Sequence, residues 1–490
     1  MSRPGPDTGG DAPASRSRLE ELDRALAALG VDTSQLDGRS CGDTVTTEAA
    51  TTNTDTTEAA TTDTVTTDAV SRAGLPDEGG PPVHRSRFGP PLPRNFRLLW
   101  GATALSNLGD GLRLVAMPLL ATSVTSDPRL IAGVTVAQRL PWLFFILPGG
   151  AWADRFDRRL LRMRIDIARA LVMSLLVAAI VLDQASIVVI YVVAALLASA
   201  EAVVDSSSMA MVPATVEGPD LERAVGRLGS TELAMNDLVG PPLGGLLFGL
   251  AIAVPFGIDA ATFVGAALVM ALVSGRYRPA AAQAKSGDRS SMRASLAEGI
   301  RWLWNHRLLR TLALVSTALG TASFVGTAVF VIFATETLEL SEFGYGLLLV
   351  PGAVGGIAGS LIAPRFRRFA LRRTLPIAVV GSGASTWLMA VSSSPLVVGA
   401  LSAVSLGSVM VWNVLTLALR QRVIPDEMLG RVGASYRFLV YLGMPFGALA
   451  GGLLANAFGV RSAIFVSGSI LVSIGLLLPV VLRGVDRYET

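Results

Sequence analysis

The chain changes character near residue 93, where a polar amino-terminal stretch is followed by a series of long apolar runs. A run of about 20 apolar residues is long enough to cross a bilayer as a helix, and a single span can satisfy its backbone hydrogen bonds only as a helix. The runs lie at 96–122, 130–152, 162–182, 187–212, 228–250, 256–274, 308–334, 345–364, 374–392, 395–418, 434–457 and 462–482. The pattern therefore predicts an all-α membrane protein with twelve transmembrane helices.

The polar stretch 1–93 has a different composition. Its segment 43–70 consists mostly of Thr, Ala, Asp and Glu and contains the string TTEAATT twice. Because such a tract has few apolar groups to bury, we expect 1–93 to be a disordered tail. The stretch also lacks the short apolar run and cleavage site of a signal peptide. Two interpretations stay open: a dispensable extension, and a docking or regulatory tail.

Arginine is concentrated in alternate connections between the apolar runs. Five arginines lie within 155–164 and five within 365–373, whereas the connection after the seventh run has three glutamates and no Arg or Lys. Basic connections stay on the cytoplasmic side of a membrane. We therefore expect a multi-pass protein of the plasma membrane with both termini in the cytoplasm.

Three pairs of similar segments indicate that the apolar region is an internal repeat. GGAWADRFDR (149–158) matches GSLIAPRFRR (359–368), glycines of 240–246 match those of 447–453, and FGIDAATFV matches FGVRSAIFV. Repeats in the same order predict two equivalent six-helix halves around a central site. The predicted domains are the cytoplasmic tail 1–93, an amino-terminal bundle 94–274, a cytoplasmic linker 275–307 with an amphipathic helix, and a carboxyl-terminal bundle 308–485.

Composition narrows the function. The chain is 51% hydrophobic and 16% charged, against roughly 25% charged in soluble proteins. The net charge of +3 comes from basic residues in short connections, which favours membrane orientation over nucleic-acid binding. Around the single lysine, Lys285, the glycines of a phosphate-binding loop are absent, so we expect no nucleotide. No nucleophile–base pair or metal cluster stands out, so we expect neither an enzyme nor a cofactor.

Several motifs resemble the major facilitator superfamily. GGAWADRFDRR (149–159) is similar to that family's loop between helices 2 and 3, and GPPLGG (240–245) to the core of its antiporter motif in helix 5. SNLGDGLRLVAMP (106–118), RLP (139–141), DIAR (166–169) and PDEMLGRV (425–432) resemble the drug and siderophore exporter branch, which includes macrolide efflux proteins and the enterobactin exporter. The resemblance covers about 94–485 and implies twelve helices and transport of a small molecule.

The carboxylates of the predicted spans are confined to the first half. Both histidines lie outside the spans, so a proton carrier must be a carboxylate. Asp110 and Arg113 share a helix face with Ser106, and Glu201 and Asp205 lie one turn apart. We expect Asp110, Arg113, Glu201 and Asp205 to serve proton coupling or substrate contact, with structural salt bridges as the alternative. Glu232 and Asp237 are weaker candidates; Asp166 and Asp259 are placed near opposite helix ends.

Two motifs are candidates for moving parts. The family resemblance implies that Asp154 helps latch the cytoplasmic side, and we assign Gly149, Asp154, Arg155 and Arg158 to this gate. In the helix-5 motif, Gly240, Pro241, Gly244 and Gly245 favour close helix packing, with a flexing role as the sharper alternative.

The second half is expected to supply the wall of a substrate cavity. Phe324, Trp412 and Asn413 combine large apolar surfaces with a few polar groups, which suits bulky amphipathic ligands. The sequence thus predicts a monomeric secondary transporter in the lipid bilayer that exports a bulky organic small molecule, such as an antibiotic or siderophore, by proton-coupled alternating access. An importer or uniporter on the same scaffold, and a transport-inactive scaffold or sensor, stay open.

Overall fold

The computed structural model describes residues 92–482, except 217, 219, 276, 278–290, 367 and 368, and it leaves out the side chains of 146–155 and 291–296. The predicted tail therefore lies almost wholly outside the described residues. All described residues belong to one compact unit, Arg85–Thr490.

The first half consists of six helical passes. They are α2 (Arg94–Val124), α3 (Pro128–Arg155), α4 (Arg158–Val181), α5 (Ile187–Thr215), a fifth pass made of α6 (Asp220–Glu232), the π-helix η2 (Leu233–Val239) and α7 (Gly240–Leu250), and α8 (Val254–Ala271). The fifth pass begins earlier than the apolar run predicts. Its first turns are amphipathic, with Asp220 and Glu222 in the first turn, so an apolar-run criterion misses them.

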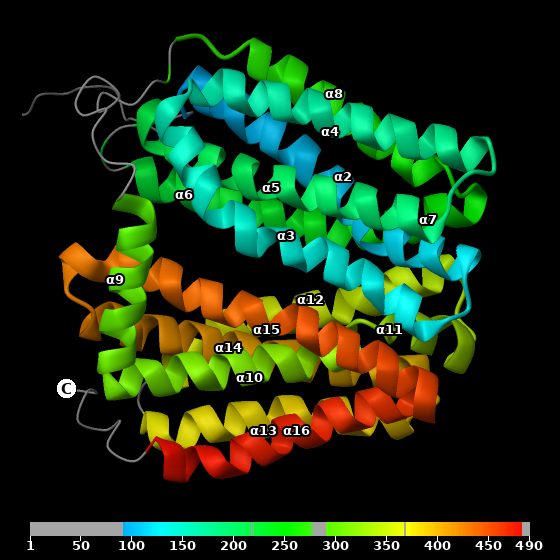
Figure 1. Ribbon diagram of the computed structural model, residues 1–490, viewed down its shortest axis with the longest axis vertical. Helices are drawn as coiled ribbons and strands as arrows, with labels where there is room; N and C mark the ends of the chain where they lie inside the picture. The colour runs from blue at the N-terminus through cyan, green and yellow to red at the C-terminus, as the bar shows by residue number, and fades with distance from the viewer. Residues whose placement is uncertain are drawn as a thin grey trace, which may run out of the picture. The chain divides into compact units, whose positions relative to one another are not determined.

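The second half repeats this arrangement after a short helix, α9 (Ser291–Asn305), which lies within the predicted linker. Its passes are α10 (Arg307–Thr327) with α11 (Phe330–Ile332) and the π-helix η4 (Phe333–Thr337), α12 (Glu342–Phe366), α13 (Leu371–Val391), α14 (Pro395–Val423), η5 (Asp426–Met428) with α15 (Leu429–Phe458), and α16 (Val460–Val481). Figure 1 shows the two sets of helices running side by side.

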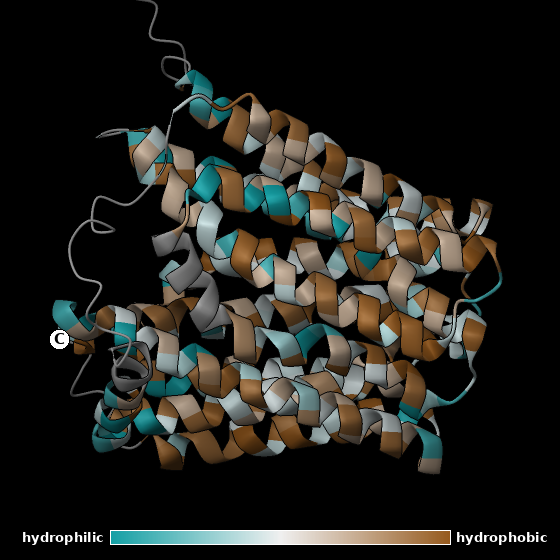
Figure 2. Ribbon diagram, turned by 45° about the horizontal axis from the view of Figure 1, so that its top comes forward, coloured by the Kyte–Doolittle hydropathy of each residue, from teal (hydrophilic) through white to brown (hydrophobic). Residues whose placement is uncertain are grey.

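The prediction of an all-α membrane protein with twelve passes is confirmed over the described residues. Nine of the described passes are long and apolar enough to cross a membrane by length and composition alone. The others are α2, α3 and α4, of which α2 and α4 carry several charged side chains in their interior. Figure 2 shows hydrophobic residues along the length of the helices. Large exposed apolar side chains, such as Leu171, Ile377 and Leu396, suit contact with lipid.

The two halves meet along two helix pairs, α3 with α15 and α7 with α12. At Gly245 an added Cβ would lie 2.8 Å from the carbonyl carbon of Glu342, and at Gly452 it would lie 3.0 Å from the Cα of Arg129. These close approaches lie near the starts of α3 and α12, whose other ends lead into the arginine-rich connections. The main hydrophobic cluster also contains residues of both halves, so the halves share one core there.

Candidate functional site

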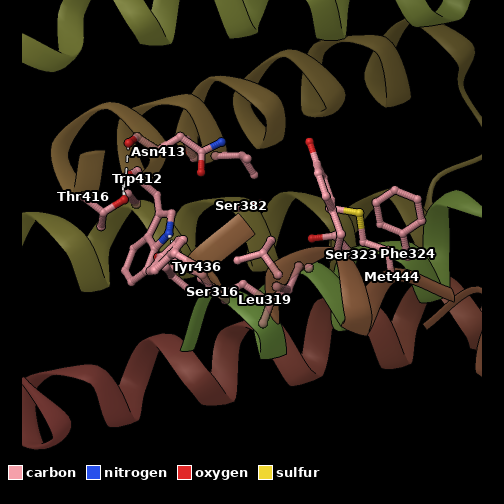
Figure 3. A pocket seen from close by; sticks show the side chains of 18 of the residues that line it. Ser316, Leu319, Ser323, Phe324, Ser382, Trp412, Asn413, Thr416, Tyr436 and Met444 are labelled. Carbon is pink, nitrogen blue, oxygen red and sulfur yellow. Dashed lines mark hydrogen bonds between the residues drawn. The ribbon is translucent and has the colours of Figure 1, made fainter. Parts of the chain in front are cut away.

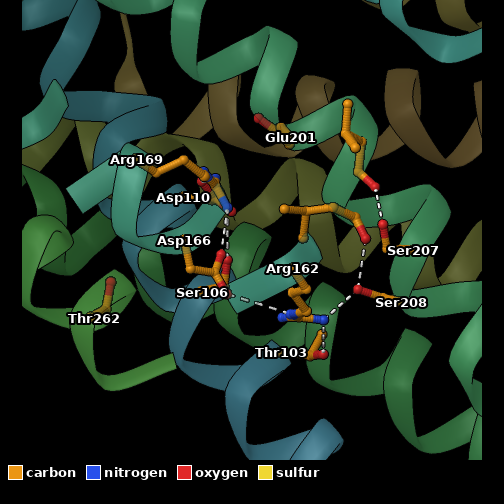
Figure 4. A network of polar contacts seen from close by, with 12 residues as sticks. Thr103, Ser106, Asp110, Arg162, Asp166, Arg169, Glu201, Ser207, Ser208 and Thr262 are labelled. Carbon is orange, nitrogen blue, oxygen red and sulfur yellow. Dashed lines mark hydrogen bonds and ion pairs between the residues drawn. The ribbon is translucent and has the colours of Figure 1, made fainter. Parts of the chain in front are cut away.

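A network of charged side chains is buried within the first half, where α2, α4, α5 and α8 pack together (Figure 4). It contains four carboxylates and three guanidinium groups, linked by distances of 3.8 Å or less: Asp110, Asp166, Glu201, Asp259, Arg113, Arg162 and Arg169. Charges at this depth are costly unless they are paired, and they mark functional sites by default.

Asp110 is the best-paired acid of the network. Its Oδ1 accepts hydrogen bonds from Arg113 Nη2 and Arg169 Nη2, both at 2.5 Å, and the residue is only 9% exposed. Arg169 also donates to Ser106 Oγ at 3.0 Å, and its guanidinium lies 4.0 Å from the centre of the Phe263 ring. Because two charged donors hold one oxygen, Asp110 fixes the positions of both arginines.

Arg113 connects the buried acids to the edge of the network. Besides Asp110, it contacts Glu201 Oε2 through Nη2 at 3.2 Å and Asp259 Oδ2 through Nε at 3.7 Å. The Glu201 side chain is 30% exposed, whereas Asp259 is fully buried. One guanidinium group is therefore shared by three carboxylates that differ in their access to water.

Asp259 is the least compensated acid. Neither of its carboxylate oxygens has a hydrogen-bond partner among the described residues, and Arg113 Nε, the nearest cation described, is itself without one. The carboxylate lies directly against Gly109 of α2, at a place where an added Cβ would overlap it and Thr262. Asp166 also lacks hydrogen bonds, but it lies between Arg162 at 3.6 Å and Arg169 at 3.8 Å.

The network has one more acid than base among its described members, so its formal charge is −1 when every group is ionised. Arg162, one of the three cations, also donates hydrogen bonds to the hydroxyl groups of Thr103 and Ser208, which are neutral. One bound proton would make the network neutral, which a low-dielectric interior strongly favours.

The structure brings together only some of the predicted coupling residues. Asp110, Arg113 and Glu201 belong to the network, whereas Asp205 is exposed and has no ion pair with any described residue. Glu232 ends α6, and Asp237 lies within η2.

Four members of the network were not predicted as site residues: Asp166, Asp259, Arg162 and Arg169. The two acids were placed near opposite helix ends, but each contacts an arginine that also contacts Asp110 of α2. The DIAR string (166–169) was the available signal, because it contains both Asp166 and Arg169 three residues apart. Asp259 had no such signal, since its partners lie on other helices.

The predicted gate is described only in part. The side chains of Asp154 and Arg155, and the surroundings of Gly149, lie outside the described set. Arg158 Nη1 donates to the carbonyl of Ala210 at 2.8 Å, which ties the start of α4 to α5. The gate therefore stays a prediction.

The helix-5 motif lies between two helices of different halves. Gly240 packs against the backbone of Gly111, and Gly244 against that of Leu112, both in α2. Gly245 faces α12 of the second half instead. Across the same contact, an added Cβ on Gly346 of α12 would lie 2.9 Å from the carbonyl carbon of Pro241. The motif thus joins α2 and α12 through backbone contacts, with the π-helix η2 directly before it.

A cavity of about 400 Å³ lies in the second half and is lined from α10, α13, α14, α15 and α16 (Figure 3). It contains the three predicted wall residues, Phe324, Trp412 and Asn413. Trp412 Nε1 donates to Ser316 Oγ at 3.2 Å, and Ser316 Oγ lies 2.6 Å from the hydroxyl of Tyr436. The wall combines aromatic faces with hydroxyl groups, of which those of Ser316 and Tyr436 bond to each other.

Two pseudo-repeated six-helix halves, a buried charge network in one and a cavity in the other define a secondary transporter of the major facilitator class. The model of the family described as "Transmembrane secretion effector" matches residues 85–488, and the chain belongs to this family. It is therefore a multi-pass membrane transporter rather than an enzyme.

Curated relatives include exporters. The chain is 28% identical to the multidrug efflux pump Tap of Mycolicibacterium fortuitum, over 79% of this chain and 93% of the relative. It is 22% identical to macrolide efflux protein A of Streptococcus pyogenes (79% and 95%). It is 27% identical to the enterobactin exporter EntS of Citrobacter koseri (80% and 93%).

Solved structures share the fold. A bacterial homologue of the human lysosomal transporter Spinster matches with a TM-score of 0.62 at 14% identity, over 81% of this chain and 96% of that chain. The nucleoside transporter NupG matches with a TM-score of 0.61 at 11% identity, over 80% and 99%. At these identities the likeness concerns the fold alone.

Proposed function

We propose that this protein exports a bulky organic small molecule across the plasma membrane by proton-coupled alternating access. The relatives that are named for efflux of drugs, a macrolide and a siderophore support export of such a compound. The observation that carries the coupling is the buried network of the first half, which has four carboxylates for three arginines.

Asp259 is the carboxylate that we assign to the carried proton. Asp110 is held by two arginines, so protonating it would break two charge-assisted bonds. Asp259 loses only one long contact, at 3.7 Å to Arg113, when it is neutral. Glu201, partly exposed and bonded to the same arginine, is the route by which a proton reaches the interior. In this scheme Asp110 is a structural anchor, and Arg113 turns between Glu201 and Asp259.

Alternating access requires the halves to separate on one side while they close on the other. The glycine contacts of α7 with α12 and of α3 with α15 are candidates for the closed side. We assign the arginine-rich connections to the cytoplasm, because basic connections are retained there. Both termini are then cytoplasmic, and the glycine contacts seal the external side.

The energy available from protons is sufficient for useful export. One charge crossing 100 mV releases about 2.3 kcal/mol. That energy corresponds to a substrate gradient of roughly fiftyfold, because about 1.4 kcal/mol is a factor of ten.

Transport into inside-out vesicles tests the proposal. Ethidium, erythromycin and fluorescein are supplied outside, with an acidic lumen formed by respiration and then collapsed with nigericin. We expect at least one compound to accumulate and to leave when the gradient is collapsed. Accumulation that is the same with and without nigericin would contradict proton coupling.

Asp259→Asn is the decisive variant in this assay. It is expected to keep the protein folded and to remove the dependence on the gradient, because the neutral amide mimics the protonated acid. Asp183→Asn is the matched control, since Asp183 is an exposed acid in the α4–α5 connection with a φ of 56°, which Asn tolerates. Gradient-dependent uptake by Asp259→Asn would remove Asp259 from the mechanism.

A further inference from the structure

The charges around the second-half cavity have a single sign. Among the described residues that line it, Arg420 and Arg437 are charged, and none is Asp or Glu. They flank Tyr436 on two different helices, α14 and α15. Two cations beside one cavity repel each other, and an anion placed between them relieves that repulsion.

Arg420 is held in an orientation that leaves its outer edge available. Its guanidinium lies 3.8 Å from the centre of the Tyr436 ring, and its Nε donates to the carbonyl of Thr416 at 3.2 Å. Its two Nη groups have no hydrogen-bond partner among the described residues. A guanidinium that is stacked and fixed through Nε presents a two-nitrogen edge, which matches the two oxygens of a carboxylate.

A third arginine approaches the cavity from the first half. The guanidinium of Arg139, on α3, lies 5.5 Å from the centre of the Phe324 ring, and Phe324 lines the cavity. Trp142, one turn later on α3, meets the lining residue Tyr441 edge-on, with ring centres 6.1 Å apart. The facing helix thus places another positive charge and another aromatic ring against two residues that line the cavity.

We propose that this cavity binds an organic anion, with a carboxylate or phenolate at Arg420 and Arg437 and a planar or apolar body against the aromatic wall. The proposal rests on the proposed function, since it names the substrate class of that transporter. A cation of the same shape meets two guanidinium groups that form no ion pair with any described carboxylate, and a neutral compound gains only the apolar contacts.

The proposal is tested by the binding of two dyes that share a xanthene body, fluorescein as the anion and rhodamine 123 as the cation. Fluorescence anisotropy is measured on the full-length protein in detergent at pH 7.5, without a membrane gradient. We expect fluorescein to bind at least tenfold more tightly than rhodamine 123. Arg420→Gln and Arg437→Gln are each expected to weaken fluorescein about tenfold, which corresponds to about 1.4 kcal/mol, and to leave rhodamine 123 unchanged or tighter.

Two controls separate charge from folding and from shape. Arg372→Gln removes an exposed arginine of α13 that does not line the cavity, and it is expected to change neither dye. Arg420→Lys keeps the charge but loses the two-nitrogen edge, so it should retain only part of the fluorescein affinity. The melting temperature of each variant is compared with that of the natural protein, so that a loss of fold is recognised. If Arg420→Gln does not fold, the fluorescein affinity of Arg420→Lys tests the role of Arg420 instead.

Several results would overturn the inference. They are tighter binding of rhodamine 123, no measurable binding of fluorescein, or fluorescein binding that Arg420→Gln and Arg437→Gln leave unchanged. These measurements need no gradient, so they are independent of proton coupling. Arginine-dependent fluorescein binding together with gradient-independent transport would support the inference and contradict the proposed coupling.

Discussion

The two halves repeat one topology but differ in what they bury. In the described part of the chain, every buried charged residue belongs to the first half: Asp110, Arg113, Asp157, Arg162, Asp166, Arg169 and Asp259. The buried polar residues of the second half are Ser and Thr, such as Ser382 and Ser405, whose hydroxyls lie 3.0 Å apart. A duplicated scaffold therefore does not require duplicated chemistry.

Corresponding positions make the difference concrete. At the offset of 210 that relates the two basic loops, Asp166 corresponds to Pro376 and Arg169 to Val379. Both second-half residues are buried, and Val379 lines the cavity. One half thus holds buried charges where the other holds the wall of a cavity, and we assign proton binding and substrate binding to these different halves.

The largest expected effect comes from removing a shared cation of the first half. Arg169→Gln leaves Asp110 and Asp166 short of positive charge in a buried site, and breaking a buried pair costs about 3–5 kcal/mol. We expect low yield and a lower melting temperature in detergent. The double variant with Asp110→Asn should recover part of that loss, because one unpaired acid is removed as well. Equal stability of Arg169→Gln and the natural protein would show that the network is not a stabilising unit.

The next effect concerns the contact between the halves. In Gly245→Ala, the added methyl group meets the backbone of Glu342 and the Cα of Phe343, the latter at 3.1 Å. A backbone neighbour cannot move aside as a flexible side chain can, so we expect vesicle uptake to fall more than tenfold while much of the fold remains. Gly257→Ala is the control, since an added Cβ there meets nothing within 4 Å. If Gly245→Ala and Gly257→Ala both lose uptake, the loss cannot be attributed to the contact between the halves.

A smaller effect is expected in the cavity wall. Asn413 is exposed and lines the cavity, so Asn413→Ala should weaken dye binding about three- to tenfold through one lost hydrogen bond and leave stability unchanged. Gln421→Ala, on the same helix but outside the lining, should have no effect. If Asn413→Ala changes gradient dependence instead of affinity, the separation of roles between the halves fails.

The smallest effect, no loss of transport, is expected when residues 1–90 are deleted. The bundle contains the network and the cavity without this stretch, so vesicle uptake should match that of the full chain after correction for expression. Loss of function with normal expression would favour the scaffold or sensor interpretation.

The fold was predictable from the sequence because each membrane span can be recognised by its length and hydropathy. Basic connections also alternate with connections that have little or no Arg and Lys. The site was less predictable. Asp110 and Arg113 could be paired on one helix by spacing alone. The contact of Arg113 with Asp259, 146 positions later in the chain, depends on how α2 packs against α8, which no local pattern contains. The cavity residues Phe324 and Trp412 were visible as aromatic positions, but Arg420 lies just beyond the predicted run 395–418, and Arg437, inside the run 434–457, was assigned no role.

The glycine contacts between α7 and α12 have a thermodynamic consequence. Backbone meets backbone at Gly245 and Gly346, so parting the two helices uncovers peptide groups at these positions. It also uncovers Phe248 of α7 and Tyr345 and Leu348 of α12, which belong to the hydrophobic cluster that the halves share. Exposure of apolar surface raises the heat capacity, whereas exposure of polar surface lowers it. The exposed peptide groups should therefore offset part of the heat-capacity increase that the apolar side chains cause, and the van't Hoff line of opening should curve less than a purely apolar contact would require.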